Sequence, residues 1–445
     1  MEAAQHSRDV RASEDDARAS DGVQPSGDLR PSKRTRPSDG ARPSKEVGPS
    51  KEARLLRVVL SCALLCGLVL SRRLWFSSAE PSSTRLYPNV PAFDFLPRVA
   101  QSFDYVWLSA LVALLAAVAL AKRPRAYAWA FVLLAAAFAL FDVSRWQPWF
   151  YQYLFMTLAF AACARGGEDE DGARETLRAC GLVVACVYFW SGAQKLNPQF
   201  FSEVFPSLAA PYLARLPASL ARLQTPLAVL APAVEVCAGV FLLTRRLRRV
   251  GVLLALLTHA AVLLLFVPFR RNNVIWPWNV AMAAFVLIIF RRRAGGFRDF
   301  LPCRAWSFQT LVLVLFGLMP LLSFFGLWGL YQSAALYSGN TARAEIGLSE
   351  RVARSLPPRV QTRLRPAPAG FMLDVSQWSY AELNVPAYPS ARVYARAAAA
   401  LCGFAAEPSD VRLIMTEQPR LFGGEPRTRT LDCGALAPEV VRARP

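Results

Sequence analysis

Nine apolar stretches, each near the length of a membrane-spanning helix, dominate the hydropathy pattern of the chain. A helix needs roughly 17 to 25 mainly apolar residues to cross the hydrocarbon layer, and several stretches lie at the short end of that range. The pattern therefore predicts a mainly α fold, a polytopic helical membrane bundle with about nine spans, one of which is a candidate re-entrant or paired element. The stretches lie near residues 55–70, 105–121, 127–141, 148–164, 179–196, 226–243, 250–268, 275–290 and 308–331.

Basic residues gather in the loops after the second, sixth and eighth apolar stretches. Lys and Arg near the ends of spans stay on the cytoplasmic side, so this distribution predicts that the N-terminus lies inside and the segment after Tyr331 lies outside. We expect an integral multi-pass protein of the cell inner membrane. The three basic clusters are Lys122, Arg123 and Arg125; Arg245, Arg246, Arg248 and Arg249; and Arg291, Arg292, Arg293 and Arg298.

The first 54 residues differ in composition from the rest of the chain. They are rich in Ser, Arg, Asp and Pro, and Pro-Ser pairs recur every six residues from Pro31 to Pro49. A segment with so little apolar surface cannot bury enough of it to fold, so residues 1–54 are predicted to be a disordered basic cytoplasmic tail. The net charge of +19 comes from this tail and the loops, which favours membrane lipids as partners and predicts no nucleic-acid partner.

Residues 332–445, which follow the predicted bundle of residues 55–331, have the pattern of a small external α+β domain. The apolar pieces at 370–375 and 411–415 predict strands, and residues 390–402 predict a helix. A Pro-rich linker is expected around residues 356–368.

The nine cysteines indicate no metal site. Six of them lie within or beside apolar stretches, where cysteine acts as a small hydrophobic residue, and no Cys-x-x-Cys or Cys/His pair at metal-ligand spacing occurs. Cys402 and Cys433 both lie in the external segment. An oxidising compartment permits a disulfide between them, and the sequence leaves their pairing open.

Lys195 ends the fifth apolar stretch, in the run VYFWSGAQKLNPQFF at residues 187–201. An ionisable group at mid-helix in a membrane costs about 2.5 to 3.5 kcal/mol on insertion scales, so it usually marks a functional site or a partner. The alternative is snorkelling, in which the aliphatic stem lies in lipid and the ammonium reaches the head groups. A lysine enclosed by apolar groups would be a usable base.

Two further ionisable residues are expected near mid-membrane. Glu235 and His259 each lie about ten residues into the sixth and seventh stretches. One interpretation is a polar pair between them that only joins two helices. The other is a site that handles protons or binds a ligand, because His259 is the single histidine outside the N-terminal tail.

Charged, amide and tryptophan side chains gather at the same outer level as Lys195. They form either an aromatic interface belt or the mouth of a polar pocket that binds substrate. The candidate substrate-binding residues are Asp142, Arg145 and Trp146 between the third and fourth stretches, and Asn273 and Trp276 between the seventh and eighth.

Several of these runs together resemble the HTTM domain of the vitamin K-dependent gamma-carboxylase family. They are FDVSRWQPWFYQYLFMTLAF (141–160), VYFWSGAQKL (187–196), EVCAGVFLL (235–243), the His259 stretch with its Trp-Pro-Trp turn, and MPLLSFFGLWGLYQSAALYSGNTARAEI (319–346). The resemblance covers roughly residues 55–350, with a weaker echo in the external domain. The Gly-x-x-Lys-Leu element alone is also similar to the smaller DoxX-like membrane proteins.

The resemblance implies roles for two residues. Lys195 matches the family's lysine that deprotonates the reduced quinone, and Glu235 matches an acidic residue buried in the bundle. The run WQPWFYQY lacks the histidine that the family's carboxylases carry there, and about 110 residues replace their large luminal substrate-binding region. Both departures weigh against glutamate carboxylation of a protein substrate.

Two hypotheses of different classes follow. The first is a membrane enzyme acting on a quinone or another lipid-soluble substrate, with Lys195 as general base, Glu235 and His259 as proton partners, and a reduced quinone as the cofactor. The second is a non-catalytic lipid-binding or assembly scaffold whose external domain holds a partner. The enzyme hypothesis requires Lys195 to face a cavity shared with the outer loops.

Overall fold

The computed structural model describes residues 48–76, 85–97, 101–163, 169–215, 217, 222–269, 272–291, 295–301, 307–419 and 426–436. Residues 47–445 form one compact unit. The predicted disordered tail lies outside the described residues as far as residue 47, and the first helix begins at Pro49, within the segment predicted as tail.

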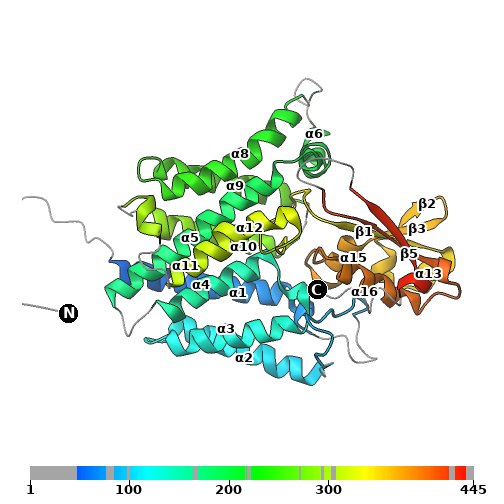
Figure 1. Cartoon of the computed structure of the whole chain (residues 1–445), viewed down its shortest axis with the longest axis horizontal. Coiled ribbons are helices and arrows are strands. Elements are labelled where there is room, and N and C mark those ends of the chain that lie inside the picture. The colour runs from blue at the N-terminus through cyan, green and yellow to red at the C-terminus, as the bar shows by residue number, and fades with distance from the viewer. Residues whose placement is uncertain are drawn as a thin grey trace, which may run out of the picture. The chain divides into compact units, whose positions relative to one another are not determined.

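A helix or a run of short helices occupies each of the nine predicted apolar stretches (Figure 1). Six of them are long and apolar enough to cross a membrane: α1, α2, α5, α8, α9 and the run from Phe308 to Phe325. The bounds are α1 Pro49–Leu70, α2 Gln101–Leu120, α3 Arg125–Leu140, α4 Pro148–Ala162, α5 Glu170–Lys195, α8 Gln224–Leu243, α9 Arg248–Phe266, α10 Ile275–Phe290, and then α11 Phe308–Val312, η5 Leu313–Leu318, α12 Met319–Leu322 and η6 Ser323–Phe325.

Six of the nine predicted stretches thus have the length of a spanning helix among the described residues, and the other three are shorter. Helices α3 and α10 have 16 residues each and α4 has 15, just below the roughly 17 to 25 residues of a typical spanning helix. Most of α4 is buried in the bundle. The predicted fold class, a helical membrane bundle with a small external domain, is confirmed.

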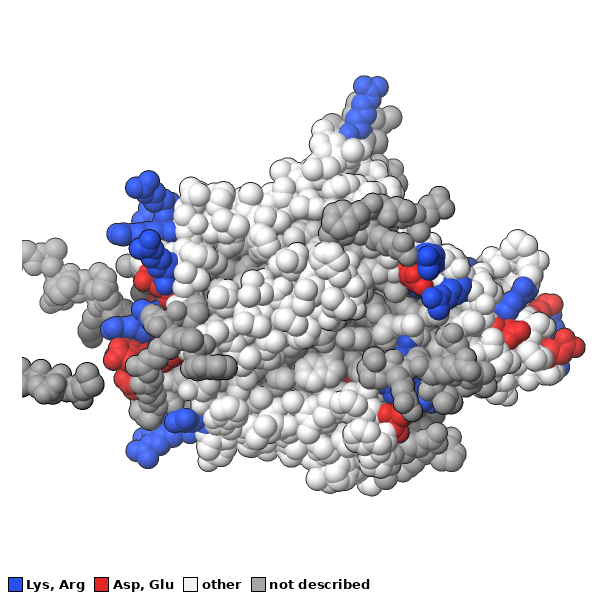
Figure 2. Space-filling model, in the orientation of Figure 1, with Lys and Arg blue, Asp and Glu red and all other residues white. Residues whose placement is uncertain are grey.

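The uncharged surface of the bundle lies between a charged end and the charged side chains of the C-terminal domain (Figure 2). One end carries many Lys and Arg side chains and lies opposite the sheet of the C-terminal domain (Figures 1 and 2). Because uncharged surface faces lipid and basic loops stay cytoplasmic, this arrangement agrees with the predicted orientation.

Two glycines allow α5 and α8 to pack closely. A Cβ atom added at Gly192 would lie 2.5 Å from the carbonyl oxygen of Pro232, and one added at Gly239 would lie 2.7 Å from that of Ala185. Small residues at helix contacts let backbones approach in this way in membranes. The contact fixes the position of α8 beside the end of α5.

The C-terminal domain is built on a five-stranded antiparallel sheet with the order β2-β3-β1-β4-β5. Ile346, Leu373 and Leu413 point from three strands into its core, where Trp378 is also fully buried. The strands are β1 Arg343–Leu348, β2 Arg365–Ala367, β3 Gly370–Asp374, β4 Val411–Thr416 and β5 Thr428–Asp432, and the helices are α13 Glu350–Ser355, α14 Pro358–Gln361, α15 Val375–Leu383 and α16 Ala391–Cys402.

Local sequence signals account for most elements of this domain. The predicted helix at 390–402 is α16, and Ser390 caps it by accepting a hydrogen bond from the backbone N–H of Val393. The predicted linker at 356–368 instead contains α14 and β2. Proline is tolerated there because Pro358 occupies the first turn of a helix and Pro366 lies in an edge strand.

A carboxylate joins the external domain to the segment that follows α1. Glu382 of α15 accepts hydrogen bonds from the backbone N–H groups of Leu86 and Tyr87, at 2.7 and 2.8 Å, and from the indole of Trp378. Charge-assisted hydrogen bonds of this kind are about twice as strong as neutral ones.

A disulfide joins Cys402, at the end of α16, to Cys433, just after β5. We expect the double variant Cys402→Ala/Cys433→Ala to lose about 3 to 4 kcal/mol, because the crosslink closes a loop between residues 31 positions apart and so limits the unfolded chain. Protease sensitivity of the external domain during heating measures the loss. The control Cys62→Ala/Cys66→Ala removes two unpaired thiols of α1. Equal sensitivity of the two double variants would contradict the prediction.

Candidate functional site

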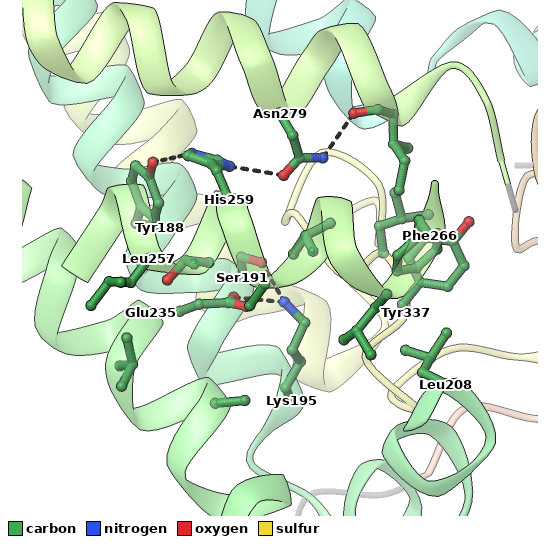
Figure 3. A pocket seen from close by; sticks show the side chains of 18 of the residues that line it. Tyr188, Ser191, Lys195, Leu208, Glu235, Leu257, His259, Phe266, Asn279 and Tyr337 are labelled. Atoms are coloured by element: carbon green, nitrogen blue, oxygen red, sulfur yellow. Dashed lines mark hydrogen bonds and ion pairs between the residues drawn. The ribbon is translucent and has the colours of Figure 1, made fainter. Parts of the chain in front are cut away.

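Three polar side chains share one face of α5. Tyr188, Ser191 and Lys195 are spaced by three and four residues, which places them above one another on a helix. They point into a space bordered by α8, α9 and α10, which supply Glu235, His259 and Asn279 (Figure 3).

Lys195 forms an ion pair with Glu235. Its Nζ lies 2.6 Å from Glu235 Oε2 and donates a second hydrogen bond, of 2.7 Å, to Ser191 Oγ. Helical side chains lean towards the N-terminus of their helix, and Lys195 thus turns back to Ser191 and into the bundle. The snorkelling geometry is not adopted.

His259 belongs to a separate polar chain, and the pair with Glu235 considered from the sequence does not form. Asn279 Nδ2 donates to the carbonyl of Ile275, so Asn279 Oδ1 faces the imidazole and accepts from His259 Nδ1, 2.8 Å away. In a neutral imidazole the other nitrogen is then an acceptor, and His259 Nε2 accepts from the hydroxyl of Tyr188.

The ion pair and the Tyr188–His259–Asn279 chain line one cavity of about 480 Å³. Nearly all of its other lining residues are apolar or aromatic, as is usual for sites that bind small molecules. They include Phe205 and Leu208; Leu227 and Leu230 of α8; Leu257 and Leu264 of α9; Trp278 and Met282 of α10; and Leu336 and Tyr337.

Tyr337 connects the cavity to the external domain. Its hydroxyl lies 2.5 Å from that of Tyr380 on α15 and accepts a 2.8 Å hydrogen bond from Asn272 Nδ2. Burial, with a contribution from Tyr337, raises the pKa of Tyr380 well above its ordinary value, so its hydroxyl stays neutral at physiological pH. Lys195 thus faces a cavity shared with an outer loop.

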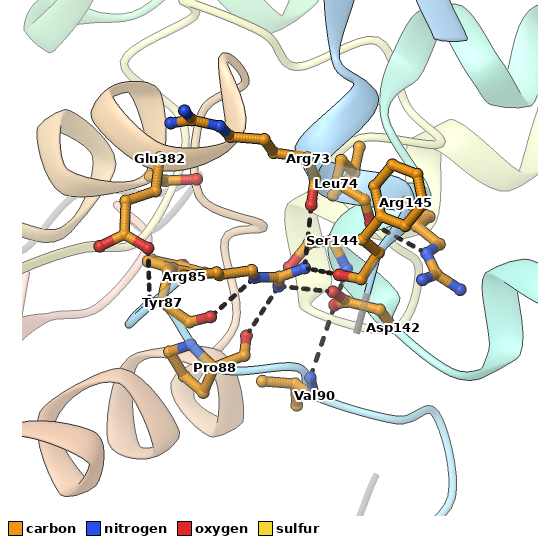
Figure 4. A network of polar contacts seen from close by, with 12 residues as sticks. Arg73, Leu74, Arg85, Tyr87, Pro88, Val90, Asp142, Ser144, Arg145 and Glu382 are labelled. Carbon is orange, nitrogen blue, oxygen red and sulfur yellow. Dashed lines mark hydrogen bonds and ion pairs between the residues drawn. The ribbon is translucent and has the colours of Figure 1, made fainter. Parts of the chain in front are cut away.

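Asp142 and Arg145 belong to a different polar network, away from the cavity lining (Figure 4). Asp142 is fully buried, pairs with Arg85 at 2.9 Å and accepts from the backbone N–H of Ser144. Arg145 donates to the carbonyls of Leu74 and Phe138, and its guanidinium stacks 3.8 Å from the centre of the Phe138 ring. Asp142 and Arg145 therefore hold together the segments that follow α1 and α3.

The other three candidate substrate-binding residues also lie outside the cavity lining. Trp146 packs edge-on against Phe150. Asn273 precedes α10, and α10 turns Trp278 and Asn279 towards the cavity in place of Trp276. Helical periodicity explains the difference, because residues 275, 278, 279 and 282 share one face of α10 and residue 276 does not. That same spacing in the sequence is the signal by which Asn279 could have been found.

Tyr188, Ser191 and Tyr337 were also missed by reasoning from the sequence. The first two could have been found from their helical spacing to Lys195, whereas nothing local marks Tyr337. Among the described residues, no group of three or more His, Cys, Asp or Glu side chains could hold a metal ion.

A family model for the methylamine utilisation protein MauE matches residues 173–261. The matched part, about a fifth of the chain, runs from α5 to α9 and includes Lys195, Glu235 and His259. No curated protein and no solved structure matches the chain significantly. With the six apolar helices, this similarity to a membrane protein family confirms an integral multi-pass membrane protein and agrees with the inner membrane as its location. None of these findings confirms the resemblance to the HTTM domain, which stays a hypothesis.

We expect Gly192→Ala to separate α5 from α8 and to lower the melting temperature of the purified protein. Its Cβ would lie 2.5 Å from a backbone oxygen that cannot move aside, and such overpacking costs about 1 to 3 kcal/mol. Thermal unfolding in detergent measures the effect. Gly403→Ala is the control, since a Cβ there meets no atom within 4 Å. A Gly192→Ala protein as stable as this control would contradict the packing argument.

Proposed function

We propose that the chain is a membrane enzyme that removes a proton from a lipid-soluble substrate with an acidic hydroxyl, for which a reduced quinone is the best-fitting class. The observation that supports it most is the Lys195–Glu235 ion pair on the wall of an otherwise apolar cavity. Substrate sites are commonly apolar cavities with a few well-placed polar groups.

A gain in folding stability does not explain well why the Lys195–Glu235 ion pair is buried. Taking two charges out of water costs several kcal/mol per ion, and apolar side chains of similar volume often stabilise a buried site as well or better. Ionisable groups inside membrane bundles are rare and usually mark sites that bind substrates or move protons. The position of the pair on a cavity wall, rather than within a packed helix contact, supports the second explanation.

The pair, rather than the lysine alone, is the base in this proposal. Lys195 already donates to Glu235, so a proton leaving the substrate passes to the carboxylate of Glu235. The substrate O–H bond breaks, its electron pair stays on the oxygen, and the ammonium of Lys195 stabilises the resulting anion. In a site of low dielectric constant, a fixed positive charge beside a developing oxyanion is worth more than in water.

The hydrogen-bonded chain Tyr188–His259–Asn279 supports binding of a substrate with two oxygen atoms. A hydroquinone carries oxygens at opposite ends of a flat ring, and the Tyr188–His259 pair lies on the cavity wall together with the ion pair. We assign Tyr188 the role of accepting a hydrogen bond from the far hydroxyl of the substrate, while His259, in the tautomer that Asn279 fixes, accepts the hydrogen bond of Tyr188.

Paired substitutions separate the proposed chemistry from a structural role. We expect Lys195→Met and Glu235→Leu each to lower the melting temperature, because breaking a buried pair costs about 3 to 5 kcal/mol, and Lys195→Met/Glu235→Leu to recover most of the loss. The double variant should bind trimethylhydroquinone under anaerobic conditions without the red shift in absorbance that marks its anion, whereas the unaltered protein should produce that shift.

The exposed ion pair Arg343–Glu203 supplies the matched control. It has the same 2.6 Å separation, but its side chains are 49% and 52% exposed, so Arg343→Met/Glu203→Leu should change stability by about 0 to 1 kcal/mol and leave the red shift intact. A red shift that survives in Lys195→Met/Glu235→Leu would rule out the pair as the base.

The molecule that accompanies the purified protein discriminates between the enzyme and a lipid-binding scaffold. We expect solvent extraction followed by mass spectrometry to detect a quinone in excess over its share of the surrounding membrane, because the cavity excludes water and offers donors to its oxygens. Phospholipid alone, at the ratio found in the membrane, would favour the scaffold hypothesis instead.

A further inference from the structure

The outer halves of α8 and α9 form one side of the cavity. Its lining residues lie between positions 227 and 235 of α8 and between 254 and 266 of α9, whereas the inner ends of the two helices are in close contact. A Cβ added at Gly251, near the start of α9, would lie 2.7 Å from the backbone nitrogen of Leu242. The cavity therefore occupies the part of the helix pair nearer the external domain.

Four leucines on this side both line the cavity and are exposed at the surface of the protein. Leu227 and Leu230 of α8 are 45% and 54% exposed, and Leu257 and Leu264 of α9 are 55% and 59% exposed. Side chains that do both are expected at the rim of an opening. Figure 3 shows Leu257 and Leu208 on either side of the Lys195–Glu235 pair.

The opening leads to lipid. Both α8 and α9 are candidate membrane spans, so their exposed apolar side chains contact acyl chains rather than water. Large exposed leucines at the edge of an apolar cavity would be unfavourable in water and are favourable in hydrocarbon.

Helix α6, Phe205–Leu213, borders this opening at its outer end. Phe205 and Leu208 of α6 line the cavity, and the hydroxyl of Tyr212 donates to the carbonyl of Leu264 on α9. The ring of Tyr212 also packs against that of Phe269, with centroids 5.3 Å apart. These contacts hold α6 against the outer end of α9.

We propose that the cavity receives its ligand sideways from the bilayer, through an opening between α8 and α9 bordered by α6, and that this ligand carries a long apolar tail that remains in the opening. The inference rests on the proposed function, because it identifies the ligand as a molecule whose polar head meets Lys195 and Glu235.

The arrangement suits a tailed molecule energetically. The tail passes from lipid to a wall of leucine side chains, which costs little because both surroundings are apolar. The head exchanges lipid, where its oxygens lack partners, for the ammonium of Lys195 and for the hydroxyl oxygen of Tyr188, which can accept from the head because its own proton is donated to His259. A molecule without a tail gains only the hydrogen bonds of its head.

The test compares two probes that share one ring, trimethylhydroquinone and the same ring with a farnesyl chain, both kept reduced under anaerobic conditions, in protein reconstituted into phosphatidylcholine nanodiscs. The variants Leu230→Trp and Leu257→Trp put a bulky ring into the opening. Their controls, Val229→Trp and Leu253→Trp, put it on neighbouring positions of the same helices that are 46% and 55% exposed but do not line the cavity. Calorimetry measures the affinity for each probe.

We expect Leu230→Trp and Leu257→Trp to weaken binding of the farnesylated probe about tenfold or more and to leave the tailless probe within about twofold of the unaltered protein. The controls should bind both probes as the unaltered protein does. Equal loss in the variants and their controls, or equal loss for the two probes, would overturn the lateral opening while leaving the proposed function standing. If neither probe binds the unaltered protein, both the proposed substrate class and this inference fail.

Discussion

The close approach of α5 and α8 is the contact on which the candidate site depends. Gly192 and Gly239 bring the two backbones together, and this proximity allows the short reach from Lys195 to Glu235. A side chain at either glycine would separate the helices and leave two ionised groups apart in an apolar environment. That state is costly, since a lone charge in a membrane lacks both water and a counterion. The ion pair therefore depends on the close packing of α5 against α8.

The rest of the site extends this contact in two directions. Towards α9 and α10, the Tyr188–His259–Asn279 chain satisfies a second set of polar groups and fixes a neutral imidazole beside the cavity. Towards the external domain, Tyr337 lines the cavity and is hydrogen-bonded to Tyr380. The domain is in turn held by Glu382, which binds backbone N–H groups after α1. The wall of the cavity is thus shared between the bundle and a domain distant in sequence.

Asp142 and Arg145 are buried and charged, as Lys195 and Glu235 are, but they lie in a structural network and not on the cavity wall. Both had been expected near Lys195 because they lie at the same outer level. The structure places them in a network with backbone carbonyls, Arg85 and an aromatic ring. Such a network stabilises loops and presents little to a ligand. Depth in the membrane, which the sequence indicates, does not specify the direction in which a side chain points around the bundle axis.

The sequence by itself determined the features that depend on local pattern. Apolar stretches specify the helices because an unsatisfied backbone is intolerable in lipid, and α16 follows from its cap and its apolar positions. It also singled out Lys195, Glu235 and His259, because ionisable groups in apolar stretches are conspicuous. Only the tertiary structure decided which of them meet: Glu235 pairs with Lys195, 40 positions away, and His259 with Tyr188 and Asn279. Pairing depends on the rotation and separation of helices, which arise from contacts such as those of Gly192 and Gly239 between segments far apart in the chain.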